Sequence, residues 1–139
     1  MEEQLIQEAG SGSAGDVSDA EASAVFLHLL RYLLVTERGE DLEFLGGLPP
    51  SWLRAGSRTA LTDQLSEFGR FTLELRIGAD GRTGHLTISP IEGRGSSGTV
   101  SCLLRALREG GFGHLDGTPL PERLSFPWRA GLDLAFRRL

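Results

Sequence analysis

The chain is poor in the residues that cross-link small proteins or bind metals through sulfur. Cys102 is the only cysteine among 139 residues, so neither a disulfide framework nor a thiolate zinc site can form within one chain. His28, His85 and His114 are far apart in the sequence and share no ligand spacing. We therefore expect no metal site and no cofactor, and a fold that is stabilised by its hydrophobic core, for which this length is sufficient.

Long uncharged apolar runs are also missing, and so is an excess of positive charge. No stretch reaches the roughly 20 apolar residues of a membrane-spanning helix. The N-terminus, MEEQLIQEAGSGSAG, lacks the basic region and apolar run of a secretory signal. The formal net charge of −5 disfavours nucleic acid or an anionic membrane as the main partner, because both attract clustered cations. The compartment stays unknown.

Turn-forming residues, by contrast, are abundant. The chain has 19 glycines and six prolines, more than is typical of a helical bundle. Residues 10–15, with the sequence GSGSAG, have the composition of a flexible linker. The sequence therefore predicts a flexible tail over residues 1–17, followed by a domain with many turns.

A helix is predicted over residues 18–35. Ser18 and Glu21 form a capping box, in which each side chain bonds the backbone amide of the other residue. Apolar residues then recur at helical spacing, and they cover most of the circumference of the helix instead of one stripe. Such a helix needs neighbours on more than one side. The positions that we expect to form an interface are Val25, Phe26, Leu29, Leu30 and Leu33.

Short alternating runs follow, which predict a β-sandwich over residues 36–139. The clearest run, residues 70–77, alternates between apolar and polar residues, and Asp80-Gly81 after it is typical of a hairpin turn. Residues 99–107 fit a strand or a helix, and their neighbours favour a strand. The fold class that we predict is mostly β: about eight short strands in an antiparallel, jelly-roll-like sandwich, preceded by one helix.

Part of the sequence resembles a known family. The run LHLLRYLLVTERGEDLEFLGGLPPSWLRAG, residues 27–56, is similar to a segment of glycoside hydrolases built on an (α/α)6 barrel, where a helix leads into two strands, a Gly-Leu/Val-Pro-x-x-Trp-Leu element and a glycine. The stretches LTDQLSEFGRFTLELRI, GHLDGTPL and LSFPWRAGLDLAF continue the resemblance in the same order.

The resemblance implies a function without catalysis. In this family the catalytic carboxylates lie in the helical barrel, and the C-terminal sandwich packs beside the barrel as an accessory domain. No catalytic residue can be transferred to this chain, because the segments that match are those of the sandwich. The expected partner is a helical-barrel catalytic domain, or a second copy of this chain.

Two alternatives remain open. A carbohydrate-binding module would use Trp52 or Trp128 as a platform for a sugar ring, although large aromatic residues more often fill the core. A small stand-alone hydrolase would need two carboxylates across a cleft, one of them with a raised pKa. The candidates for such a pair are Glu37, Glu40, Asp41, Glu43, Asp63, Glu67 and Asp80.

The last third of the chain also carries many arginines. Interspersed with strands, they indicate a solvated face. The alternative is an interface with an acidic catalytic domain. These arginines are Arg105, Arg108, Arg123, Arg129, Arg137 and Arg138.

Overall fold

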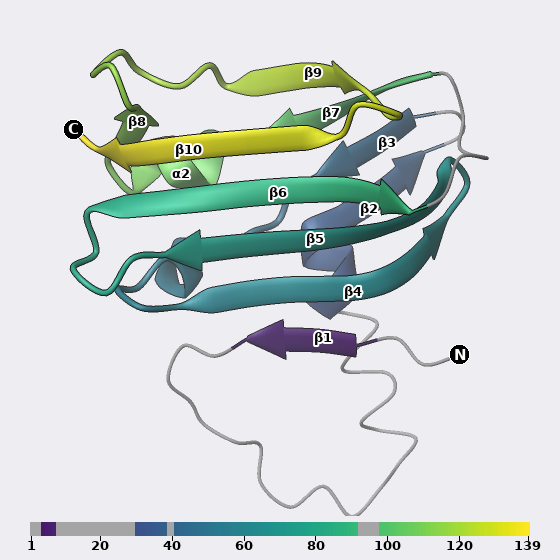
Figure 1. Cartoon of the computed structure of the whole chain (residues 1–139), viewed down its shortest axis with the longest axis horizontal. Coiled ribbons are helices and arrows are strands. Elements are labelled where there is room, and N and C mark those ends of the chain that lie inside the picture. The colour runs from purple at the N-terminus through teal and green to yellow at the C-terminus, as the bar shows by residue number, and fades with distance from the viewer. Residues whose placement is uncertain (1–3, 8–29, 39–40, 92–97) are drawn as a thin grey trace, which may run out of the picture.

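The computed structural model describes residues 4–7, 30–38, 41–91 and 98–139, and their strands form a β-sandwich of two sheets (Figure 1). Residues 30–34 are helical and lead directly into the sandwich. The strands are β1 (Gln4–Gln7), β2 (Val35–Arg38), β3 (Asp41–Phe44), β4 (Arg58–Ser66), β5 (Gly69–Ile77), β6 (Thr83–Ile91), β7 (Thr99–Leu103), β8 (Phe112–His114), β9 (Arg123–Pro127) and β10 (Leu132–Arg138), with short helices η1 (Pro50–Trp52) and α2 (Arg105–Glu109).

The two sheets differ in size and in pairing. The six-stranded sheet has the order β1-β4-β5-β6-β10-β8, and the strand pairs given for it are antiparallel. The four-stranded sheet has the order β2-β3-β7-β9, and it contains a parallel pair, β3 with β7. The predicted antiparallel sandwich is therefore confirmed, with this pair as a local exception.

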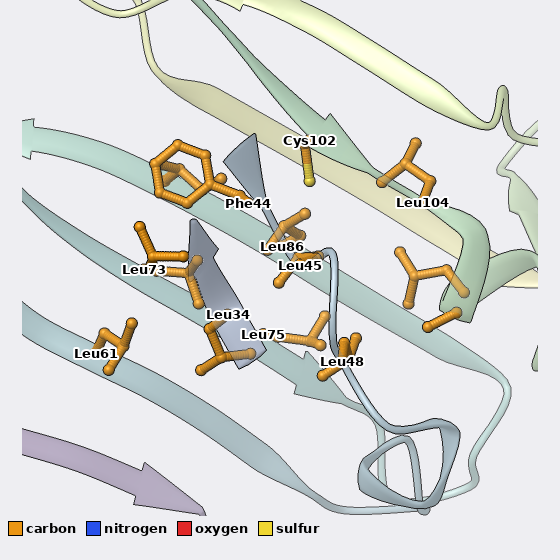
Figure 2. Packing of buried hydrophobic residues seen from close by; sticks show 14 of the residues in the cluster. Leu34, Phe44, Leu45, Leu48, Leu61, Leu73, Leu75, Leu86, Cys102 and Leu104 are labelled. Carbon is orange, nitrogen blue, oxygen red and sulfur yellow. The ribbon is translucent and has the colours of Figure 1, made fainter. Parts of the chain in front are cut away.

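The core lies between the sheets, where the alternating residues of each strand meet. On β5, Phe71, Leu73 and Leu75 are each at most 1% exposed. Phe71 meets Phe44 of the four-stranded sheet edge to face, with ring centroids 5.3 Å apart. Figure 2 shows the leucines of the larger sheet facing Phe44 and Cys102. Each buried Leu or Phe contributes about 1.5–3 kcal/mol relative to its exposed state, so this layer is the main source of stability.

The N-terminal region departs from the prediction at one point. The predicted tail, residues 1–17, contains β1, which pairs antiparallel with β4 in a register that places Leu5 opposite Leu61. The flexible-tail interpretation is wrong for these four residues, because they complete the backbone hydrogen bonds along an otherwise open sheet edge. The rest of the tail and residues 18–29 of the predicted helix lie outside the described residues. The helical end at 30–34 agrees with the prediction.

Three elements differ in extent from the sequence prediction. The weak strand predicted near residue 58 runs on to Ser66 as β4, through an irregularity between Leu61 and Gln64 where Asp63 has a φ of 52°. The ambiguous segment 99–107 is a strand followed by a helix, so both interpretations apply in part. The sequence gives little signal for β8, which has three residues and is separated from α2 by two glycines.

Candidate functional site

The end of the leading helix is bonded into both sheets. The backbone amides of Leu45 and Gly47, which follow β3, donate to the carbonyl oxygens of Leu34 and Leu33 at 2.8 Å each. A glycine is required at position 47, because a Cβ there would lie 3.1 Å from the Leu33 Cα. We call this arrangement, together with its contacts to β4, the helix–sheet joint.

Arg31 makes the second half of the joint. Its Nε donates to Oε1 of Gln64 at 3.1 Å, and its Nη2 donates to the Leu65 carbonyl at 2.8 Å. Gln64 is fully buried, and its amide nitrogen donates to the Thr62 carbonyl, so both ends of this buried amide have partners. The irregularity in β4 turns Gln64 toward the helix. This explains why a polar residue occupies an inward position.

Two large hydrophobic side chains lie exposed at the joint. Tyr32 is 64% exposed and Leu65 is 67% exposed, and the bond from Arg31 to the Leu65 carbonyl joins their two segments. The predicted interface residues Leu30 and Leu33 are half-buried. Val25, Phe26 and Leu29 lie outside the described residues. The exposed part of the predicted interface is therefore Tyr32 and Leu65, and the outward position of Leu65 depends on the course of β4, which the sequence pattern did not show.

The two tryptophans have different environments. Trp128 is 1% exposed, and Phe68 and Phe71 lie against it with ring centroids 5.9 Å away. Its indole faces are therefore occupied by the core and have no room for a sugar ring. Trp52, on η1, is half-buried against the core, and its carbonyl accepts a bond from the Ser57 hydroxyl. Trp52 alone keeps part of its surface accessible.

Several of the candidate carboxylates form ion pairs with arginine. Glu37 is 3.8 Å from Arg31, and Asp63 is 3.2 Å from Arg70. Asp41 is exposed and lies opposite Arg38 in the hairpin of β2 and β3, and Asp80 accepts a bond from the Arg82 amide in a turn. Glu67 is exposed, and Glu40 lies outside the described residues. These positions are spread over both sheets and do not converge on one cleft.

Glu74, which the sequence did not single out, is held by two arginines. Its Oε1 accepts from Nε of Arg76 at 2.9 Å, and its Oε2 accepts from Nε of Arg58 at 2.7 Å. The Arg76 hydrogen bond, opposed by partial burial and supported by Arg58, lowers the pKa of the Glu74 carboxyl from its ordinary value. The shift is opposite to the one that a general acid needs at neutral pH.

The paired Glu74 predicts a pH-dependent contribution to stability. Its folded-state pKa is depressed, so its contribution is fully present above the unfolded pKa of about 4.3 and disappears as the pH falls through the folded value. We expect Glu74→Gln to lower the free energy of unfolding by about 1 kcal/mol at pH 7 and to have no effect near pH 2.5, because exposed ion pairs contribute little each. Urea unfolding at both pH values measures this.

The matched control for this prediction is Glu122→Gln. Glu122 pairs with Arg105 at 2.9 Å, and both side chains are more than half exposed. We expect a change within about 0.5 kcal/mol at pH 7. A loss for Glu74→Gln that persists unchanged at pH 2.5 would contradict the role of its charge.

A polar hollow of about 340 Å³ lies on the outer face of the four-stranded sheet. The strand registers align Thr36, Glu43, Ser101 and Ser125 in one row across all four strands. Arg123 pairs with Glu43 at 3.1 Å beside this row. Cys102 points to the opposite face, where burial, together with the nearby charge of Glu43, raises the pKa of its thiol. The hollow therefore presents hydroxyl and charged groups, while the thiol stays in the core.

Two hollows lie at one end of the six-stranded sheet, where β5 ends and β6 begins (Figure 1). The first has a volume of about 440 Å³ and the second of about 460 Å³. Thr83 lines both hollows. We call their charged residues the basic strip: Arg58, Arg76, Arg82, His85, Arg137 and Arg138.

Metal and membrane sites were also considered. In the part of the chain that the structure describes, no three His, Cys, Asp or Glu side chains gather in a way that could hold a metal ion. His85 lies on β6 and contacts Asp133 of β10, while His28 lies outside the described residues. None of the described helical segments has the length and apolar character needed to cross a bilayer.

The architecture defines the class of this protein: a two-sheet β-sandwich with a helix before its strands. No protein-family model matches the chain, and neither the curated proteins nor the solved structures yield a match. The proposals below therefore depend on the geometry of the joint and of the hollows, together with the sequence resemblance.

Proposed function

We propose that this chain is a non-catalytic accessory β-sandwich that packs against the helical-barrel catalytic domain of a glycoside hydrolase. The observation that carries the proposal is the helix–sheet joint. The last helical turn is held by Leu45 and Gly47 on one side and by Gln64 and the Leu65 carbonyl on the other. A helix fixed in this way sets the orientation of the sandwich relative to any helical domain that it contacts.

The exposed residues at the joint supply the docking surface. Tyr32 and Leu65 together present an aromatic and an aliphatic side chain, each more than 60% exposed. Aromatic residues at the centre of an interface often carry much of the binding energy, and burial of a leucine contributes about 1.5–3 kcal/mol. A partner that covers both side chains would stabilise the complex in addition to any contact with the leading helix.

Co-purification tests this proposal. The partner to use is the helical-barrel enzyme encoded beside this chain in the same genome, expressed together with a tagged form of the chain. We expect a one-to-one complex, and we expect the double substitution Tyr32→Ser with Leu65→Ser to weaken its dissociation constant at least tenfold, which corresponds to about 1.4 kcal/mol.

Leu115→Ser is the matched control, because Leu115 is 54% exposed but lies in the turn after β8. We expect it to leave the affinity unchanged. The proposal fails if neighbouring genes encode no helical barrel, if the two proteins do not associate, or if Leu115→Ser weakens binding as much as the double substitution does.

A second candidate function is carbohydrate binding. The version that depends on stacking retains only Trp52, since both faces of Trp128 are covered. The polar hollows on the outer faces of the two sheets favour a version that uses hydrogen bonds and charge instead. Their linings differ in one respect that bears on the ligand. The hollow of the four-stranded sheet is lined by Asp41 and Glu43, whereas no acidic side chain lines the two hollows of the basic strip.

A further inference from the structure

Three residues of the basic strip form one row across three neighbouring strands. Arg58 of β4 lies opposite Arg76 of β5, and Arg76 lies opposite His85 of β6. Like charges directly opposite each other destabilise a sheet. Sites where a sequence breaks a local rule of this kind are often functional sites. The row is therefore a candidate binding site for an anion.

Carboxylates outside the first hollow hold these cations in place. Glu74 binds the Nε atoms of Arg58 and Arg76, and Asp133 contacts His85, but neither carboxylate lines the hollow. Arg76 is 60% exposed and uses its Nε for Glu74, so its terminal nitrogens are the donors that can reach a ligand. A guanidinium that is already oriented loses less entropy when it binds a carboxylate, which it can do through two parallel hydrogen bonds.

Small residues keep the first hollow open. Gly56, Gly78 and Gly84 contribute backbone to its lining. A side chain cannot be added at Gly84, because its Cβ would lie 2.6 Å from Cε2 of Phe136. Volumes of about 440 and 460 Å³ lie in the range of small-molecule sites, which are concave, in contrast to most protein–protein docking surfaces.

We propose that the basic strip binds an acidic saccharide, with the carboxylates of two neighbouring uronic acid units in the two hollows on either side of Thr83. The anion part of this proposal depends on the strip alone, and the saccharide part rests on the proposed role in carbohydrate metabolism. Nucleic acid fits less well, because no aromatic residue lines either hollow for base stacking and the net charge of the chain is −5.

Calorimetric titration of the full chain with trigalacturonate at low salt tests the proposal, with galactotriose as the neutral comparison. We expect trigalacturonate to bind, galactotriose not to bind, and 0.5 M NaCl to weaken the interaction. Arg76→Gln should raise the dissociation constant at least tenfold. Arg105→Gln is the matched control, because Arg105 is similarly exposed at 65% and also pairs with a glutamate, but it lies on α2 outside the strip.

Other outcomes would overturn the proposal. These are equal binding of the neutral sugar, no binding at millimolar concentration, or an equal loss in Arg105→Gln. Sulfate that binds as tightly as trigalacturonate would reduce the strip to a general anion site, and tighter binding of oligothymidylate would replace the saccharide with nucleic acid. A thermal melt of Arg76→Gln that matches that of the unmodified chain excludes unfolding as the cause.

The experiment separates this proposal from the accessory function. A chain that binds trigalacturonate but does not associate with a helical barrel supports the strip and removes the accessory role. The Tyr32→Ser, Leu65→Ser variant should retain its affinity for trigalacturonate, because neither residue lines the hollows. Loss of that affinity would contradict the location of the site.

Discussion

Replacement of Trp128 by alanine is expected to lower the free energy of unfolding by about 3–5 kcal/mol, the range for a large aromatic side chain removed from a core. Trp128 is 1% exposed and lies between Phe68 and Phe71, so its loss leaves a cavity and removes two aromatic contacts. The residue also connects β9 to the core through Phe71 of the opposite sheet. Urea unfolding followed by far-ultraviolet circular dichroism measures the change without depending on the deleted fluorophore.

Trp52→Ala is the control for this substitution. Trp52 is half-buried on a short helix at the edge of the core, so we expect a smaller loss, near 1–2 kcal/mol, in proportion to its smaller buried area. Equal losses for the two variants would show that Trp128 does not fill the core as described. A loss below 1 kcal/mol for Trp128→Ala would show the same.

Gly84→Ala is expected to destabilise the sandwich by about 1–3 kcal/mol, the usual cost of overpacking a core. Gly84 of β6 pairs directly with Phe136 of β10, and the ring of Phe136 lies over the glycine. Phe136 is fully buried and meets Phe112 edge to face at 5.1 Å, so the ring cannot move aside without losing that contact. Urea unfolding again gives the magnitude.

Two variants test the cause of this loss. In the double variant Gly84→Ala with Phe136→Leu, the smaller side chain leaves room for the new methyl group, so the combined loss should be less than the sum of the single losses. Gly46→Ala should change stability by less than about 0.5 kcal/mol, because its Cβ would meet only the flexible end of Glu43 at 3.3 Å. Additive losses in the double variant would rule out the steric explanation.

Much of the fold was predictable because alternation specifies a strand whose two faces differ. The run on β5 places Phe71, Leu73 and Leu75 inward, and the hairpin between β5 and β6 turns at Asp80-Gly81, as the sequence predicted. The hairpin of β2 and β3 also forms, although its turn at 39–40 lies outside the described residues. Short elements such as β1 and β8 were missed, because three or four residues carry too little periodicity to be distinguished from a loop.

The candidate sites were less predictable, because they depend on register and not on sequence spacing. Arg58, Arg76 and His85 are separated by 18 and 9 positions, and only the pairing of β4, β5 and β6 places them in one row. The sequence indicated a basic last third, but of those arginines only Arg137 and Arg138 belong to the strip. Trp128 was weighed as a sugar platform from its type alone, and its burial follows from the packing of both sheets.

The parallel pair of β3 and β7 has a consequence for how the chain folds. Glu43 and Ser101 are partners in this pair, and the intervening chain carries β4, β5 and β6. Loop closure over such a separation carries a large entropic cost that nearest-neighbour hairpins avoid. The smaller sheet is therefore completed only after the central meander of the larger sheet has brought the two strands together, which makes its assembly the late, rate-limiting event of folding.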